Sequence, residues 1–418
     1  MSGESDQLKI DWLKKHAIPI ATTEPDDGFD DLMPLKELIG DARIVGLGEA
    51  THGTHEFFTM KHRLVEFLVR EMAFTVFALE ANTPEAFLMD DYIRNGTGSP
   101  EDLLRGMHFW TWNTQEILNM IRWMRAYNES KPAAKPIRFT GFDAQFVALS
   151  INIVLEFVKH ANPEYYETAT GMYSDIGNAL PNRINFNSTN DDSNNTIDYA
   201  DINRMQCNAE RLTKHLEKNQ VTYSEKCSLK EIAWAIHNAR IVSQFLCLMT
   251  EARTGVAEES RDLLMAKNIN WIQSQNRDAK IIVWAHNYHI ARGENNMGYN
   301  LHQKYGDTYL PIGFCFHEGL YNAREGFEGD IRAFKAAPAH EGSCERLLHN
   351  AGIPNFILDL RNASADDPSS EWLTKTMDMH DIGAVKQKDE FRSLNISEEF
   401  DALVFIDSTT PSILLPQG

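Results

Sequence analysis

The sequence lacks the features of a secreted, membrane-spanning or nucleic-acid-binding protein. Its five cysteines lie at least twenty residues apart, so there is no CxxC pair and no zinc-ribbon spacing. The formal net charge is −20, whereas phosphate binding needs a basic face. No run approaches the roughly 18–20 apolar residues that span a bilayer, and the start "MSGESDQLKI" carries no secretory signal pattern. We therefore expect a cytoplasmic protein that has neither nucleic acid nor a membrane as its partner.

Several catalytic motifs are also missing. The sequence contains no GxSxG, so it does not support a nucleophile-elbow serine hydrolase, and it has no GxxxxGK[ST] or GxGxxG to cradle a nucleotide. The zinc-binding pattern HExxH is absent as well. Histidine, glutamate and lysine remain as the available chemistry, without an obvious nucleophile. This composition favours direct attack by an activated water molecule and predicts no cofactor.

Short apolar runs separated by patterned helices indicate the fold class. Strands that alternate with helices predict a mainly parallel sheet covered by helices on both faces, which is a three-layer α/β/α fold. The first four runs are "RIVGLGE" (43–49), "FTVFALE" (74–80), "IRFTGFD" (137–143) and "KIIVWAH" (280–286). Helices are expected near 56–70, 84–94 and 114–127, and further strands at 308–316, 355–360 and 402–407.

The middle of the chain has a different pattern. Residues 146–275 read as helices, with one polar break at 182–198 that is expected to be an exposed loop. A long helical insertion of this kind is predicted to cap one end of the sheet. We expect one domain, with residues 1–145 and 276–418 as its α/β core and the insertion as part of it.

Ionisable residues stand at the ends of the first four predicted strands: Glu49, Glu80, Asp143 and His286. In open parallel sheets, ligands bind at the carboxyl ends of the strands. A functional site at that edge is therefore predicted, and a set of helix N-caps is the alternative interpretation.

Two histidines follow these strand ends at the same spacing. His52 comes three residues after Glu49, and His289 comes three residues after His286. Histidine is the usual general base, and Glu49 or Glu80 is placed to orient His52. His286 and His289 are expected to donate hydrogen bonds to an oxyanion or to position a water molecule.

Lys61 is unusual because helical spacing places it within the apolar stripe that contains Phe57, Leu64 and Leu68. A buried charge is costly unless it is paired, although a lysine can also reach outwards to solvent. We favour a lysine that points to the strand-end acids and neutralises Glu49 or Glu80, or that contacts a developing negative charge.

An aromatic segment, "MHFWTWN" (107–113), has no clear period. It fits the lining of a substrate pocket, with His108, Phe109, Trp110 and the strand-end Asp143 as the predicted substrate-binding residues. A plug of the apolar core is the equally favoured alternative.

Taken together, these motifs make the sequence resemble the erythromycin esterase family. The ordered set that carries the resemblance is "RIVGLGEATHGTHEFF", "MKHRLVEFL", "FTVFALE", "IRFTGFDAQ" and "WAHNYHI". The family also includes proteins labelled as succinoglycan-biosynthesis homologues. The resemblance implies a three-layer α/β/α fold and metal-independent hydrolysis of a macrolide lactone. It also implies that this hydrolysis confers macrolide resistance.

The resemblance also assigns roles to single residues. The GExxH histidine, taken in the family as the base that activates water, is His52, and the GExxH glutamate is Glu49. The strand-end glutamate is Glu80, and the two histidines of the AHNxH motif are His286 and His289. Lys61 stands where the family typically has arginine, and so lacks the planar fork of a guanidinium.

Three hypotheses follow. The first is a hydrolase that cleaves a macrolide-type lactone with His-activated water. The second is a metal-binding or haem-binding protein, or a metal-dependent hydrolase, because Glu49, His52, Glu80, His286 and His289 offer nitrogen and oxygen donors. The third is a carbohydrate-pathway enzyme, which only the labels of some homologues suggest.

Overall fold

The structure is a computed structural model that describes residues 2–25, 28–131, 135–179, 199–254, 259–326 and 329–416. The chain divides into two compact units, each described by itself below. Unit 1 comprises Met1–Glu80, Leu88–Thr140 and Ile269–Gly418, and unit 2 comprises Ala81–Phe87 and Gly141–Asn268. The polar loop predicted at 182–198 lies outside the described residues. The cap and single-domain organisation stay predictions.

The main sheet has nine strands in the described ranges and is mainly parallel. Strands β3, β5, β2, β6 and β11 run parallel to one another, while β7 pairs antiparallel with β6, β8 with β11 and β1 with β8. The sheet path is β1 (Ala17–Pro19), β8 (Asn355–Asp359), β11 (Ala402–Thr409), β6 (Tyr309–Arg324), β2 (Ile44–Leu47), β5 (Lys280–Trp284), β3 (Phe74–Asn82) and β4 (Arg138–Asp143), and β7 (Ile331–Lys335) pairs with β6.

All seven strands expected from apolar runs are present. Apolar side chains bury both faces of the central strands, as the fully buried β2 shows. Four further strands were not predicted: β1, β7 and the separate pair β9 (Thr376–His380) and β10 (Phe391–Asn395). These four are short: β1 has only three residues, and β7, β9 and β10 mix polar with apolar residues, so no long apolar run marks them.

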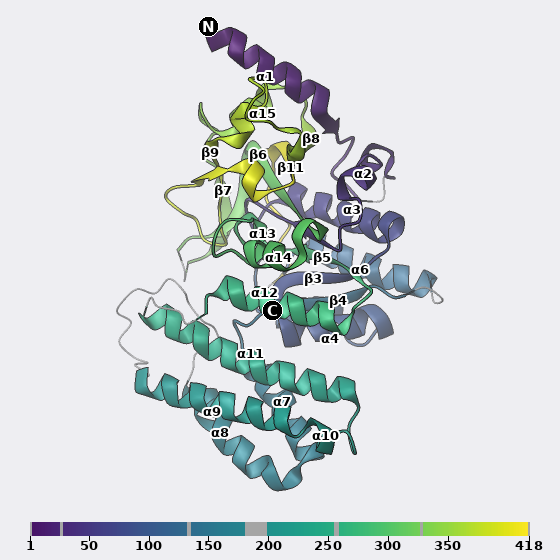
Figure 1. Ribbon diagram of the computed structural model, residues 1–418, viewed down its shortest axis with the longest axis vertical. Coiled ribbons are helices and arrows are strands. Elements are labelled where there is room, and N and C mark those ends of the chain that lie inside the picture. The colour runs from purple at the N-terminus through teal and green to yellow at the C-terminus, as the bar shows by residue number, and fades with distance from the viewer. Residues whose placement is uncertain are drawn as a thin grey trace. The chain divides into compact units, whose positions relative to one another are not determined.

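Helices cover both faces of the sheet in unit 1, which confirms the three-layer α/β/α class (Figure 1). Helix α3 (His55–Met72) packs against α6 (Gln115–Ser130) and β11, while α13 (Asn287–Ile290) and α14 (Met297–Tyr305) pack against β6. The remaining helices of unit 1 include α1 (Ser2–His16), α2 (Leu35–Ile39), α5 (Pro100–Gly106), α15 (Cys344–Asn350) and α16 (Ile396–Glu399).

Helix α3 carries part of the predicted site, and its ends have local causes. Thr54 precedes the helix in an extended conformation, and Ala73 follows it in the left-handed conformation with φ 60°. The Ala73 N–H donates to the carbonyl of Leu68, which satisfies one of the last helical acceptors. The predicted helix over 56–70 is therefore correct to within two residues at each end.

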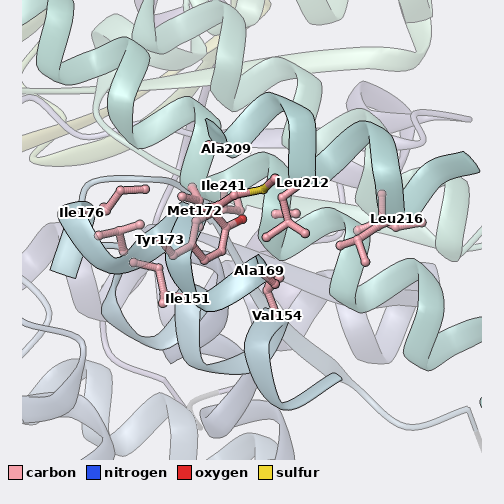
Figure 2. Close-up of a cluster of buried hydrophobic side chains, with 14 of the residues drawn as sticks. Ile151, Val154, Ala169, Met172, Tyr173, Ile176, Ala209, Leu212, Leu216 and Ile241 are labelled. Carbon is pink, nitrogen blue, oxygen red and sulfur yellow. The ribbon is translucent and has the colours of Figure 1, made fainter. Parts of the chain in front are cut away.

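Unit 2 is built mainly of helices around its own apolar core. It holds α7 (Ala148–Ala161), α8 (Tyr166–Ala179), α9 (Tyr199–Lys218), α10 (Gln220–Tyr223), α11 (Leu229–Thr254), the start of α4 (Thr83–Asn95) and most of α12 (Arg261–Gln275). Helix α11 packs against α7 and α9. Figure 2 shows Met172, Tyr173, Leu212 and Ile241 from three of these helices pointing toward one another. The helices predicted in this region are confirmed, and unit 2 has a core of the kind that folded domains need.

Leu212→Ala tests how strongly this core stabilises unit 2. The Leu212 side chain is fully buried, so its truncation removes apolar contacts and leaves a cavity. We expect the free energy of unfolding of unit 2 to fall by about 2–5 kcal/mol, measured by urea denaturation of the full chain. Val221→Ala is the control, because Val221 is 82% exposed and its change should stay within about 0.5 kcal/mol. Equal losses for the two variants would contradict this placement of the core.

Candidate functional site

The loop after β2 approaches two other segments too closely to accept a side chain at two positions: it meets a side chain at Gly48 and backbone at Gly53. A Cβ on Gly48 would lie 2.1 Å from Oδ1 of Asn287, and one on Gly53 would lie 2.0 Å from the carbonyl oxygen of Asn322. Asn287 in turn donates to the Phe314 carbonyl at 2.7 Å and accepts from the Phe314 N–H at 3.0 Å. The "GLGEATHG" loop is thereby held against β6, with Glu49 and His52 between its two glycines.

Glu49 is the most engaged side chain of the loop. It is fully buried and accepts three hydrogen bonds, from His52 Nδ1 at 2.6 Å, Lys61 Nζ at 2.7 Å and Trp284 Nε1 at 3.0 Å. Burial alone raises the pKa of Glu49, but the Lys61 ammonium and the bond from His52 outweigh it and hold the pKa below its usual range. Glu49 is therefore an anion that orients three donor side chains, those of His52, Lys61 and Trp284.

Lys61 reaches this carboxylate from the apolar stripe of α3. Its side chain is fully buried, and its ammonium also lies over the Trp284 ring, 4.4 Å from the centroid. Burial lowers the pKa of Lys61 to about 8, although the Glu49 carboxylate acts in the opposite direction. The predicted partners of Lys61 were Glu49 and Glu80, and in the structure Lys61 forms its ion pair with Glu49. The nearby Arg63 points elsewhere and forms a buried ion pair with Asp31 at 2.6 Å.

His52 is held in one orientation by this arrangement. Because an ionised carboxylate only accepts, Nδ1 of His52 carries the hydrogen in the bond to Glu49. In the neutral ring this leaves Nε2 as the basic nitrogen. The His52 side chain is 11% exposed, and its ring centroid lies 5.7 Å from that of Trp112 and 5.0 Å from that of His286.

Glu80 forms a second centre with the two later histidines. Its Oε2 accepts the backbone N–H of His286 at 3.0 Å, and its Oε1 lies 3.3 Å from Nε2 of His289. Because β2, β5 and β3 are parallel, Glu49, His286 and Glu80 come to the same edge of the sheet. Glu49 and His286 lie two residues beyond their strands, whereas Glu80 lies two residues before the end of β3, because β3 extends to Asn82.

Both ring nitrogens of His286 contact the backbone. Nε2 lies 3.1 Å from the Ile382 carbonyl, and Nδ1 accepts the Tyr288 N–H at 3.2 Å. This pattern assigns the neutral ring with its hydrogen on Nε2. Burial lowers the pKa of His286 to about 4, while the nearby Asp381 carboxylate acts against that shift. His286 therefore differs from His52, whose Nε2 is the basic nitrogen.

The aromatic segment joins the site through a residue outside the predicted substrate-binding set. Trp112 is buried, donates its Nε1–H to the Glu80 carbonyl at 2.9 Å and faces His52 edge-on. Phe109 and Trp110 are buried at 9% and 6% exposure. His108 is exposed, with φ 65° in the left-handed region. The structure leaves the substrate-binding role of these three as a prediction.

Asp143 lies in unit 2, with both carboxylate oxygens occupied there. Arg261 contacts them at 2.6 and 3.3 Å, Gln145 donates its side-chain amide at 2.6 Å, and Ala144 donates its N–H at 2.8 Å. Asp143 is the last residue of β4, as predicted. Its predicted contact with a substrate stays a prediction.

Other residues around the site were not predicted. Trp284 lies in the quoted run "KIIVWAH", and its side chain shares the Glu49 carboxylate with Lys61. Asp381 and Ile382 reach His286 from the segment after β9, and Arg392 pairs with Asp381 at 2.6 Å. No motif or periodicity marks residues 381–392, since their place beside His286 depends on the path of the C-terminal third of the chain.

The second hypothesis needs a cluster of metal ligands, and insertion into a membrane needs a long apolar helix. Among the residues with a described placement, no group of three or more His, Cys, Asp or Glu could hold a metal ion. A cation bound by Glu49 would also meet the Lys61 ammonium. None of the helices in the described ranges is long and apolar enough to cross a bilayer.

The fold and the site define an α/β protein with acid–base side chains gathered at one edge of its sheet. The sequence profile described as erythromycin esterase matches residues 69–409, so the chain belongs to the erythromycin esterase family. This membership supports a hydrolase of the esterase kind. The matched range contains Glu80, His286 and His289 but begins after Glu49, His52 and Lys61.

Individual relatives agree with this assignment. Erythromycin esterase type II of Escherichia coli is 28% identical over 388 residues, covering 85% of this chain and 90% of that protein. A Bacillus cereus protein of solved structure is 28% identical, with a TM-score of 0.84 and 99% of both chains covered. A succinoglycan biosynthesis protein of solved structure is 27% identical, with a TM-score of 0.83, covering 98% of this chain and 99% of that one.

Lys61→Met tests whether the buried pair stabilises the protein. Without the ammonium, Glu49 stays buried and loses its charged partner, so we expect the free energy of unfolding to fall by about 3–5 kcal/mol. Lys36→Met is the matched control, because Lys36 pairs with Glu71 with side chains 37% and 35% exposed, and such pairs contribute about 0–1 kcal/mol. Both variants are measured by urea denaturation at neutral pH. Adding Glu49→Gln should restore much of the loss in Lys61→Met; a double variant that is less stable still would contradict the pairing.

Proposed function

We propose that the protein is a carboxylic ester hydrolase that cleaves the lactone of a macrolide-type antibiotic with a water molecule activated by His52, without a metal ion. The family membership supports the esterase part of this proposal. The macrolide substrate is suggested by the erythromycin esterase of Escherichia coli that the chain resembles over most of its length. Such hydrolysis would inactivate the antibiotic and confer resistance.

The proposed mechanism rests on the 2.6 Å contact between Glu49 and His52. The carboxylate holds the hydrogen on Nδ1, so Nε2 is the atom that takes a proton from water as the water attacks the lactone carbonyl. Glu49 then stabilises the imidazolium, while Lys61 keeps Glu49 ionised. Glu80 suits the base role less well, because one oxygen binds the His286 N–H and the other lies beside His289.

The rest of the step follows from proton balance. The carbonyl oxygen becomes an oxyanion in the tetrahedral intermediate, and the ring oxygen leaves as an alkoxide that needs a proton. His52 returns the proton it took, and His289, 12% exposed beside Glu80, is the second group proposed to donate at these oxygens. The products are a carboxylic acid, which ionises at neutral pH by releasing its proton to solvent, and an alcohol, so the macrolide gains one water.

Purified protein with 14- and 16-membered macrolides tests the substrate. We expect a product heavier by one water in mass spectrometry, formed equally after treatment with a chelator. His52→Gln should lower kcat by roughly 10²-fold or more, with folding checked by thermal denaturation. His340→Gln is the control, because the His340 side chain is 45% exposed and pairs with Asp378. The absence of a hydrated product from every macrolide refutes the substrate, and near wild-type turnover in His52→Gln refutes the base.

The pKa of Lys61 predicts a pH limit. Below about pH 8 Lys61 is protonated and neutralises Glu49. Above about pH 8 Lys61 becomes neutral, and the Glu49 carboxylate loses its countercharge. We therefore expect kcat to decline as the pH rises through about 8. Lys61→Arg should move this decline upward, because a guanidinium stays charged to a pH above about 12. The measurement is the dependence of kcat on pH for the wild type and for Lys61→Arg. A decline of kcat at the same pH in both proteins would show that Lys61 does not cause it.

A further inference from the structure

Asp381 and Arg392 form an ion pair beside the site that the proposed reaction does not yet use. The carboxylate Oδ2 of Asp381 lies 2.6 Å from Nε of Arg392, and the two side chains are 15% and 25% exposed. Arg392 lies at the same time over the Tyr288 ring, 5.4 Å from its centroid. The pair therefore spans from the β9–β10 segment to the turn that carries His286 and His289.

The other oxygen of Asp381 faces His286. Oδ1 lies 3.4 Å from Nδ1 of His286, and it is buried without a hydrogen-bond partner among the described residues. On the opposite side of the ring, Nε2 of His286 donates to the Ile382 carbonyl at 3.1 Å. Each ring nitrogen thus has an acceptor beside it. In the neutral ring Nδ1 instead accepts the Tyr288 N–H, so only a positively charged imidazole can donate to both acceptors.

His286 is surrounded by further charged and titratable groups. Glu80 accepts its backbone N–H at 3.0 Å, the His52 ring lies 5.0 Å away, and His289 follows it on α13. Arg392 is linked to His286 through the Asp381 carboxylate, which contacts both. When His52 takes a proton from water, a positive charge therefore develops next to the His286 ring.

We propose that Asp381 is a positioning residue: held by Arg392, its carboxylate orients His286 and stabilises positive charge on the His52–His286 pair of rings during water activation. This inference rests on the proposed function, because the charge in question is the one that His52 acquires. In this role Asp381 acts through His286, the ring that its Oδ1 faces. Its contribution belongs to the transition state rather than to substrate binding, since the positive charge is absent before the water is activated.

Asp381→Asn tests the kinetic part, because it keeps the shape and removes the charge. We expect kcat for macrolide hydrolysis to fall about tenfold, the size of one pKa unit of lost electrostatic stabilisation, while KM stays unchanged. Asp378→Asn is the matched control. Asp378 lies on β9, three residues earlier, where it accepts from Ser393, and its side chain is 37% exposed. This variant should keep the wild-type kcat and KM.

A second measurement needs no substrate. In protein with ¹³C- and ¹⁵N-labelled histidine, the His286 signal is assigned by its absence from His286→Gln, and its titration is followed by NMR. Removing the Asp381 carboxylate should lower the pKa of His286 further, because that carboxylate favours the charged ring. Asp378→Asn should leave it unchanged.

The outcomes separate this inference from the proposed function. If no macrolide is hydrolysed but Asp381→Asn alone lowers the pKa of His286, the positioning role holds and the macrolide proposal fails. If hydrolysis occurs but Asp381→Asn keeps the wild-type kcat, the role of Asp381 is overturned, whatever the NMR shows. An unchanged His286 titration, or an equal loss of kcat in Asp378→Asn, overturns it as well.

Discussion

The site depends on one buried carboxylate. Glu49 has no exposure to water and accepts hydrogen bonds from three different side chains. An ionised group in such a place is tolerated only when a countercharge and donors replace its lost hydration. Lys61 supplies the countercharge, and because it comes from α3 while Trp284 comes from β5, the charge balance ties the helix, the sheet and the loop together.

The fold was largely predictable because local patterns of apolar residues in the sequence indicate its strands and helices. Continuous apolar runs mark strands buried on both faces, and the alternation of those runs with helices fixes the parallel class. Two of the strands that escaped prediction lie at the periphery of the sheet: β1 is only three residues long, and β7 mixes polar with apolar residues, so the apolar signal of both is weak. Their pairing is decided by neighbours far away in the sequence.

The site was predictable where it uses strand ends and not where it uses distant loops. Glu49, His52, Glu80 and His286 follow or end apolar runs, and the position of Lys61 on an apolar stripe already indicated a buried partner. The choice of Glu49 over Glu80 needed the structure, because both acids lie at the same edge. The segment of Asp381, Ile382 and Arg392 carries no pattern, so only its packing against His286 reveals it.

The order of strands has a consequence for biosynthesis. Strand β5 lies between β2 and β3, yet the chain passes through all of unit 2 before β5 is made. Until then β2 and β3 lack the neighbour that joins them, and Glu80 lacks the backbone N–H of His286. Contacts of such long sequence separation form late and slowly. The two carboxylates are therefore brought into register only after unit 2 and β5 have been made, so a nascent chain that ends before β5 carries Glu49, His52 and Glu80 without His286 and His289.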